Sequence, residues 1–198
     1  MLAEGFEQAA RWAGSAGVTH DLEVAVNLSA KQLAEPYFVK EVASLLQQHE
    51  EGEGGGRRPL SLWLEITETL LLEDPIVTAS LLTELRGLGV KLAIDDFGTG
   101  YSSLAYLRRF PVDCLKIDRS FVSGLDGDSD SRPIAAAIVE MAHALGLRVV
   151  AEGVETSTQL EALVDLGCDA AQGFLFAPAL PGPQLEALLA ENGGSFRR

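Results

Sequence analysis

The chain has 198 residues, of which 47% are apolar, and a formal net charge of −14 at pH 7. This length and composition are those of an ordinary globular protein with one sizeable core, so we expect a single domain over residues 1–198. The acidic charge argues against a nucleic-acid polymer as partner, because such proteins need a basic face. No apolar run approaches roughly 20 residues and no signal-peptide pattern occurs, so we expect this segment to lie in the cytoplasm, off the membrane.

The predicted elements alternate between short strands and longer helices. The chain opens in a helix whose apolar residues are Phe6, Ala9, Ala10 and Trp12. Short apolar runs that end in a polar residue predict six strands, at residues 24–27, 62–65, 91–96, 114–118, 149–152 and 170–172. Helical periodicity occurs between them at residues 37–48, 75–88, 133–145 and 157–166, and a last helix is expected over 184–190.

Glycine marks the ends of several predicted helices. Leu88-Gly89, Leu145-Gly146 and Leu166-Gly167 each precede another strand. Because parallel strands need crossover helices, this recurrence predicts a parallel α/β architecture. The charged, glycine-rich stretch of residues 50–58 cannot bury enough apolar surface to be ordered alone, so we expect a flexible loop there.

Polar side chains recur at the carboxyl ends of the predicted strands. In α/β barrels and open parallel sheets that edge carries the active site. A single acid after a strand is usually a helix cap or a turn residue, but recurrence across successive strands weakens that explanation. The residues are Asn27, Glu65, Asp95, Asp96, Lys116, Glu152 and Gln172.

These side chains are of the types that bind hard divalent cations. Carboxylates and an Asn amide suit Mg²⁺ or Mn²⁺, and two such ions can clamp a phosphodiester. Asp95 and Asp96 can both contribute only if the strand bends, since neighbours in a regular strand face opposite sides. Lys116 would lie among the acids, either in a structural ion pair with Asp118 or orienting the attacking water and stabilising phosphate charge.

Sequence motifs along almost the whole chain resemble those of the EAL domain family, in that family's order. They read VAVNLSA, LWLEITET, LAIDDFGTGYSSL, LKIDRSFV, VVAEGVET and AQGFLFAPAL. The resemblance implies a modified TIM barrel that cleaves cyclic-di-GMP to the linear dinucleotide with two Mg²⁺ or Mn²⁺ ions. It also implies a homodimer through the loop after Asp96, around residues 97–103.

Carried over motif by motif, the resemblance implies roles for individual residues. The implied metal ligands are Asn27, Glu65, Asp95, Asp96 and Glu152. The implied catalytic group consists of Lys116, which would hold the water, Glu152, and Glu68, which would brace the loop after Asp96. On the substrate side, Gln172 and Gly173 would line the pocket, and Asp118 and Glu155 would support the site.

The family pattern differs from this sequence at the front. EAL domains begin with two strands before the NLS strand, and the second carries the Glu-Ala-Leu signature whose Glu binds metal. Neither strand is recognised here, so we expect about six of the eight barrel strands and one fewer metal ligand. Open edges would then favour poor stability or self-association, and ion binding and turnover would weaken.

Two other functions are compatible with parts of the sequence. The first is a domain that binds cyclic-di-GMP without cleaving it, or that offers a protein-interaction surface. Retention of Lys116 argues against a pure receptor, which has no need of a residue that positions water. The second is another metal-dependent barrel, such as an enolase-like lyase, which the fold alone would not exclude.

Overall fold

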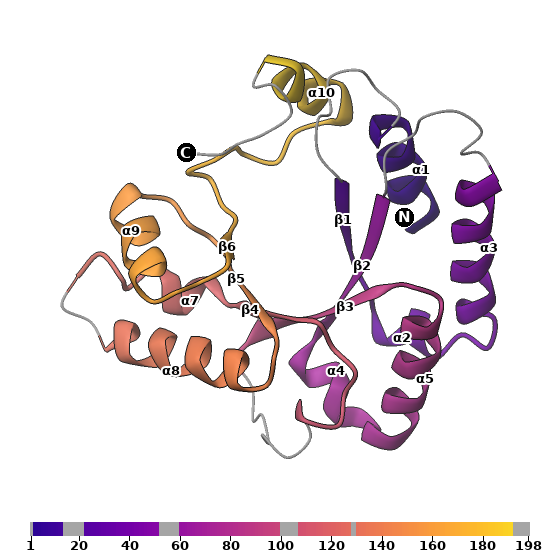
Figure 1. Ribbon diagram of the computed structural model, residues 1–198, viewed down its shortest axis with the longest axis horizontal. Coiled ribbons are helices and arrows are strands. Elements are labelled where there is room, and N and C mark those ends of the chain that lie inside the picture. Colours follow the sequence, from indigo (N-terminus) through magenta and orange to yellow (C-terminus); the bar gives the residue numbers. More distant parts are fainter. Residues whose placement is uncertain (1, 14–21, 52–59, 100–106, 128–129, 192–198) are drawn as a thin grey trace. The chain divides into compact units, whose positions relative to one another are not determined.

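The computed structural model describes residues 2–13, 22–51, 60–99, 107–127 and 130–191 (Figure 1). Strands and helices alternate along these residues, and the sheet that they form takes its six strands in chain order, β1-β2-β3-β4-β5-β6. The predicted α/β class is therefore confirmed. The elements are α1 (Leu2–Ala13), β1 (Leu22–Asn27), α2 (Ala30–Leu33), α3 (Phe38–Glu51), β2 (Leu60–Thr67), α4 (Glu68–Glu73), α5 (Pro75–Gly87), β3 (Lys91–Phe97), β4 (Cys114–Ile117), α7 (Arg119–Val122), α8 (Ser131–Ala144), β5 (Arg148–Ala151), α9 (Ser157–Asp165), β6 (Ala170–Ala171) and α10 (Gly182–Glu191).

The chain groups into two compact units, and the boundary cuts β2 between Leu64 and Glu65. The first unit comprises residues 1–64, 84–91 and 179–198, and the second comprises residues 65–83 and 92–178. The assignment of residues 1–198 to one domain stays a prediction. Among the described residues, no helix combines the length and the apolarity needed to cross a bilayer.

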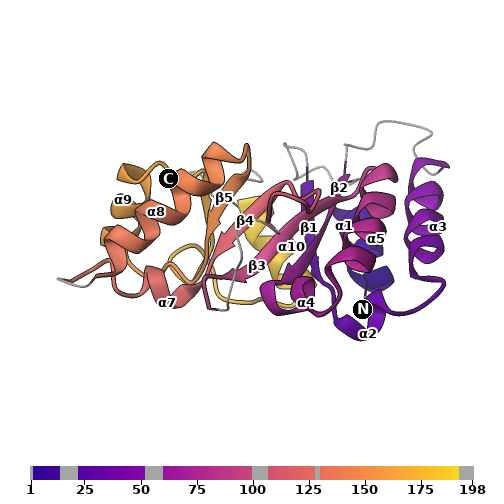
Figure 2. The same ribbon diagram turned by 90° about the horizontal axis from the view of Figure 1, so that it is seen from below.

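In the first unit, α1 lies between β1 and α3 (Figures 1 and 2). Leu2, Phe6 and Ala9 are spaced to share one helix face, and all three are buried. Helix α1 also makes polar contacts with α10. The side chains of Gln8 and Trp12 both donate hydrogen bonds to Oε1 of Glu186, at 3.3 and 2.7 Å. These bonds join α1 and α10, which are far apart in the sequence.

In the second unit, strands β3 to β6 pair in parallel, as the glycine-punctuated pattern predicts. Helices α7, α8 and α9 lie on the same side of β4, β5 and β6 (Figures 1 and 2). Helix α8 buries Ala135, Ile138, Val139 and Ala142, a spacing that places them on the face toward the strands. The strands β3 to β5 read as near-continuous apolar runs because both of their faces are covered.

Four local predictions need correction. Helix α3 continues to Glu51, so Glu50 and Glu51, placed in the predicted flexible loop, are helical. The residues before Gly52 are compatible with a helix, and the rest of that loop lies outside the described residues. Strands β4, β5 and β6 end at Ile117, Ala151 and Ala171, so Asp118, Glu152 and Gln172 follow their strands instead of belonging to them.

Asp169, which directly precedes β6, bonds to the amino end of β5, and we expect its carboxylate to stabilise the fold measurably. Oδ2 of Asp169 accepts hydrogen bonds from the Val149 N–H at 2.7 Å and from His143 Nε2 at 3.0 Å. Burial raises the pKa of Asp169, but these bonds outweigh burial and the pKa lies below its ordinary value. Asp169→Asn should therefore lower the free energy of unfolding by about 1 kcal/mol at pH 7, a figure reduced for solvent exposure.

The same cause sets the pH dependence of this contribution. A depressed pKa stabilises the fold above the unfolded value of about 3.9, and the stabilisation is lost as the pH falls through the folded value. Urea denaturation at pH 5 and at pH 3 should show the difference in free energy of unfolding between wild type and Asp169→Asn narrowing at the lower pH. Asp165→Asn is the control, because Asp165 forms only an exposed 3.4 Å pair with Arg132. A difference that widens toward acid would contradict the prediction.

Candidate metal and phosphodiester site

Most of the residues singled out in the sequence meet at the carboxyl ends of strands in the second unit. Glu65 belongs to β2, and Asp95 and Asp96 belong to β3. Lys116 belongs to β4, while Glu152 and Gln172 directly follow β5 and β6. The parallel pairing of β3 to β6 aligns these ends, which is why residues far apart in sequence come together.

Lys116 is the centre of this group. Its Nζ lies 2.7 Å from Glu65 Oε1 and 3.0 Å from Asp95 Oδ1, and it also forms an ion pair with Glu152 Oε1. The Lys116 side chain is only 6% exposed. The predicted structural pair with Asp118 is therefore replaced by contacts with three other carboxylates, and a buried ammonium is compensated by negative charge.

The strand bend that the Asp95-Asp96 pair requires is present. The register between β3 and β4 shifts between Ile94 and Phe97, and Asp96 has φ +52, in the left-handed region. The bend allows oxygen atoms of Asp95, Asp96 and Glu152 to lie within 4.8 Å of one another. A bulge of this kind redirects side chains that a regular strand would point to opposite faces.

The donor set of this acidic cluster fits a hard divalent cation. It consists of carboxylate oxygens, and Oδ1 of Asp95 is buried without accepting a hydrogen bond, although Lys116 is near it. Lys116 Nζ forms an ion pair with this oxygen at 3.0 Å, and a carboxylate has further lone pairs that can bind a cation. Mg²⁺ and Mn²⁺ prefer ligands of this type, whereas zinc and copper prefer nitrogen or sulfur.

The electrostatics show that Lys116 alone does not neutralise the acids. Burial by itself would lower the pKa of Lys116, but hydrogen bonds to Glu152 and Glu65 outweigh it and raise the pKa well above its ordinary value. Burial raises the pKa of Glu152, and Lys116 offsets this only in part. Burial and the neighbouring charges of Asp95 and Asp118 also raise the pKa of Asp96. The cluster therefore has an excess of negative charge that a cation would relieve.

Glu68 lies at the start of α4 and contacts the segment after Asp96. Its Oε2 accepts a hydrogen bond from the Gly98 N–H at 3.1 Å, and its side chain is buried. The next residues of that segment, 100–106, lie outside the described residues, as does most of the expected dimer-facing loop. The contact with Gly98 is the geometry that a bracing role for Glu68 needs.

Gln172 and Gly173 approach Glu152 from the β6 side. Gln172 Nε2 donates a 2.6 Å hydrogen bond to Glu152 Oε1. A Cβ on Gly173 would lie 2.3 Å from both the backbone nitrogen and oxygen of Val154, so only glycine fits there. Close backbone contact thus sets the position of Gln172 beside Glu152.

The remaining predicted site residues lie outside this cluster and make other contacts. Asp118 caps α7 by accepting from the Ser120 N–H at 3.0 Å; burial raises its pKa, but the Ser120 bonds outweigh burial and lower it. Glu155 is exposed and pairs with Arg119 at 2.7 Å. Asn27 ends β1 in the first unit and is exposed. Its role as a ligand stays a prediction.

Three residues that contact this region were missed at the level of sequence. They are Arg119, Asp126 and Gln159, which bond to the loop after β5 or to each other. A signal for one of them exists, because Thr156 and Gln159 have the Ser/Thr-x-x-Glu/Gln spacing of a capping box. No local pattern points to the Asp126 contact.

Comparison with known proteins identifies similar chains. A family model described as the EAL domain matches residues 1–179. NbdA of Pseudomonas aeruginosa, named a cyclic di-GMP phosphodiesterase, is 48% identical over 168 residues, which are 85% of this chain and 21% of that protein. MucR of the same organism, named a bifunctional diguanylate cyclase/cyclic di-GMP phosphodiesterase, is 45% identical over 170 residues, 86% of this chain and 24% of MucR.

Solved structures agree with these sequence matches. The MucR phosphodiesterase in complex with c-di-GMP superposes with a TM-score of 0.82 at 43% identity, covering 93% of this chain and 71% of that one. BlrP1 of Klebsiella pneumoniae, in a complex with manganese and cyclic di-GMP, has a TM-score of 0.73 at 32% identity over 89% of this chain and 42% of its own. The chain spans about a fifth to a quarter of the length of the curated relatives named above.

Proposed function

The chain belongs to the EAL domain family, and on that premise we propose that it hydrolyses cyclic-di-GMP to the linear dinucleotide with the help of Mg²⁺ or Mn²⁺. The observation that carries the proposal is Lys116, held by Glu65, Asp95 and Glu152 beside the acidic cluster. A domain that only bound a nucleotide would not need a buried ammonium among carboxylates, which costs desolvation energy. The cyclic-di-GMP complexes of MucR and BlrP1 support the choice of ligand.

In the proposed mechanism, Glu65, Asp95, Asp96 and Glu152 would hold the cations, with Asn27 as a further ligand. When bound, divalent cations supply Lewis-acid stabilisation of phosphate charge and make a bound water more acidic. Lys116 would orient the attacking water and stabilise charge that develops on the phosphate. Glu68 holds the Gly98 N–H and so limits movement of the segment after Asp96.

Residues around this set line the substrate pocket and support the metal ligands. Gln172 donates to Glu152 and so restricts the carboxylate on its β6 side, while Gly173 keeps Gln172 in place. Asp118 and Glu155 support the loops that follow β4 and β5. Phosphodiester cleavage then depends on the positioning of the reacting groups and on stabilisation of the developing charge.

We also propose a homodimer through the loop after Asp96 and a location in the cytoplasm. The first rests on the family resemblance of the motif that follows Asp96, and the Glu68 contact to Gly98 is where that loop begins. The second is consistent with Cys114 and Cys168, both free thiols, since disulfides are rare in reducing compartments.

The test of the proposed function is hydrolysis of cyclic-di-GMP by the purified chain with Mn²⁺. Glu65→Gln should lower the rate at least 100-fold, because it removes a ligand charge and a Lys116 partner while keeping the side-chain volume. Glu84→Gln is the control, since Glu84 is exposed on α5, and should leave the rate unchanged. Formation of the linear dinucleotide is followed by chromatography.

The outcomes distinguish a domain that hydrolyses cyclic-di-GMP from a domain that only binds it. Binding of cyclic-di-GMP by the folded chain without any product would favour the module that binds the nucleotide without cleaving it. Equal rates for wild type and Glu65→Gln would show that the carboxylate cluster is not the catalytic centre.

A further inference from the structure

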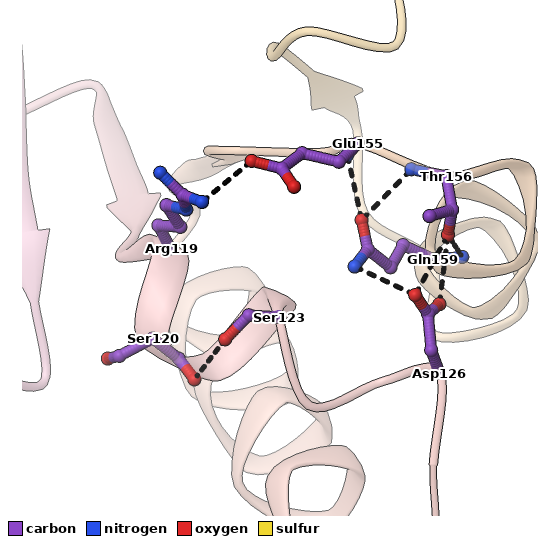
Figure 3. Close-up of polar contacts among 7 residues, drawn as sticks. All are labelled: Arg119, Ser120, Ser123, Asp126, Glu155, Thr156 and Gln159. Carbon is purple, nitrogen blue, oxygen red and sulfur yellow. Dashed lines mark hydrogen bonds and ion pairs between the residues drawn. The ribbon is translucent and has the colours of Figure 1, made fainter.

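A polar network outside the proposed metal ligands joins the turn after α7 to the loop after β5 (Figure 3). Gln159, in the first turn of α9, is only 4% exposed. Its Oε1 accepts hydrogen bonds from the N–H groups of Glu155 at 2.8 Å and Thr156 at 3.1 Å. Its Nε2 donates to Oδ2 of Asp126 at 3.0 Å. Both ends of the buried amide are therefore used.

The network also includes Asp126, so it connects the capped start of α9 to a second segment of the chain. A capping box needs only the side chains of Thr156 and Gln159, and both of its bonds are present. The carboxylate of Asp126 is an addition from another part of the chain, and it accepts from Thr156 Oγ1 at 2.9 and 3.0 Å as well as from Gln159. Charge-assisted bonds of this kind are stronger than neutral ones. The start of α9 is thus tied to the turn that follows α7.

The other end of the α7 segment contacts the same loop. Arg119 Nη2 lies 2.7 Å from Glu155 Oε1 (Figure 3). The aliphatic part of Arg119 packs on Gly153, where an added Cβ would lie 2.4 Å from Arg119 Cγ. Gly153 has φ +68, which is the left-handed region that favours glycine. Residues 119–126 therefore hold the loop after β5 at two points.

The loop held in this way carries Glu152. The Glu152 N–H bonds to Ile117 O at 3.1 Å, and its carboxylate contacts Lys116 and Gln172. Only Gly153 and Val154 lie between Glu152 and the first N–H that Gln159 accepts. A shift of the Glu155–Thr156 backbone would therefore move the Glu152 carboxylate, and a site ligand tolerates only small displacements.

We propose that Gln159, with Asp126 as its partner, is a positioning residue that fixes Glu152 for binding of the divalent cation. The inference rests on the proposed function for the identity of Glu152 as a ligand. Gln159 does not touch the substrate or the cluster itself. It acts through the backbone of the loop, in the way that outer hydrogen bonds orient metal ligands in other sites.

The test measures Mn²⁺ binding to the full chain without substrate, by electron paramagnetic resonance of free Mn²⁺. Gln159→Leu keeps a side chain of similar size but removes all three bonds, and should weaken Mn²⁺ binding on the order of 10-fold. Asp169→Asn is the matched control, because it destabilises the same unit from the opposite end of β5. Its Mn²⁺ affinity should equal that of wild type.

An exchange of the two polar groups gives a second, sharper variant. Gln159→Glu keeps the acceptor for the Glu155 and Thr156 N–H groups but places a carboxylate against Asp126, so it should weaken Mn²⁺ binding several-fold. Adding Asp126→Asn again pairs one amide with one carboxylate. The amide at position 126 now donates the hydrogen bond, and the carboxylate at position 159 accepts it. The double variant should recover wild-type affinity to within about twofold, because the bond between the two positions forms again.

The outcomes distinguish this inference from the proposed function. Wild-type affinity in Gln159→Leu, or a double variant no better than Gln159→Glu, would overturn the positioning role and leave the hydrolysis proposal standing. The expected Mn²⁺ pattern in a chain that forms no linear dinucleotide would support the positioning role and overturn the proposed reaction. A wild-type chain that binds no Mn²⁺ would overturn both.

Discussion

Replacing Lys116 with methionine is expected to lower the free energy of unfolding of the metal-free protein by about 3 kcal/mol. One ammonium faces the carboxylates of Glu65, Asp95 and Glu152, whose side chains are 11 to 17% exposed. Removing it leaves like charges close together with little water to screen them. Methionine fills a similar volume, so lost packing does not explain the effect.

The same variant should respond more strongly to metal than wild type does. A cation at the acidic cluster would supply the positive charge that Lys116 no longer provides, so Mn²⁺ should raise the melting temperature of Lys116→Met by more than that of wild type. Removing the metal with a chelator should reverse the gain. Hydrolysis should nevertheless stay at least 100-fold below wild type, because a cation does not replace the group that orients the water.

Lys40→Met is the control for Lys116→Met. Lys40 is exposed on α3, where its ammonium lies 5.7 Å from the centroid of the Tyr37 ring, and its removal should change stability by less than about 1 kcal/mol. Melting is followed by circular dichroism in chelator and in Mn²⁺. If Lys116→Met melts like wild type in chelator, the view of Lys116 as the main counter-charge of the cluster is wrong.

Gly173→Ala is expected to cost about 3 kcal/mol of stability and to impair the site as well. The new Cβ would lie 2.3 Å from the nitrogen and the oxygen of Val154, and these are backbone atoms that cannot move without disturbing both chain segments. The Val154 N–H bonds to Gln172 O at 3.0 Å, and the Leu175 N–H bonds to Val154 O at 2.9 Å. Relieving the overlap would separate Gln172 from Glu152.

Gly167→Ala separates this close contact from the general cost of losing a glycine. Gly167 has φ +79 but nothing within 4 Å of an added Cβ, so the variant should lose only about 1 kcal/mol from backbone strain. Urea denaturation of both variants measures the difference. Equal losses in the two variants would mean that the chain around Val154 yields to the extra carbon, and that Gly173 does not hold Gln172 in place.

Local patterns in the sequence were sufficient for the order of the elements. The strands and the longer helices occur where apolar periodicity and the Leu-Gly stops place them, because these signals act within a few residues. Short elements were missed for the same reason. Helices α2, α4 and α7 have only four to six residues, too few for a helical period to show.

The sequence predicted which residues would gather at the candidate site, but not which of them would contact one another. Polar residues at successive strand ends pointed to Glu65, Asp95, Lys116 and Glu152, since parallel strands present these ends along one edge. The sequence left two alternatives for Lys116, a structural ion pair with Asp118 on the same strand face or a role in orienting the attacking water. The structure instead pairs Lys116 with acids from β2, β3 and the end of β5, because contact across strands depends on register.

The chain's own residue order decided that strands alternate with helices and that acids follow the strands, because these properties depend on neighbours in sequence. Tertiary structure decided the rest. The bend at Asp96, the exclusion of any side chain at Gly173 and the bond between Asp126 and Gln159 depend on segments that meet only after folding. The sequence determines the charge and size of each side chain. The distance in space between two side chains that are far apart in the sequence depends on how the folded backbone packs.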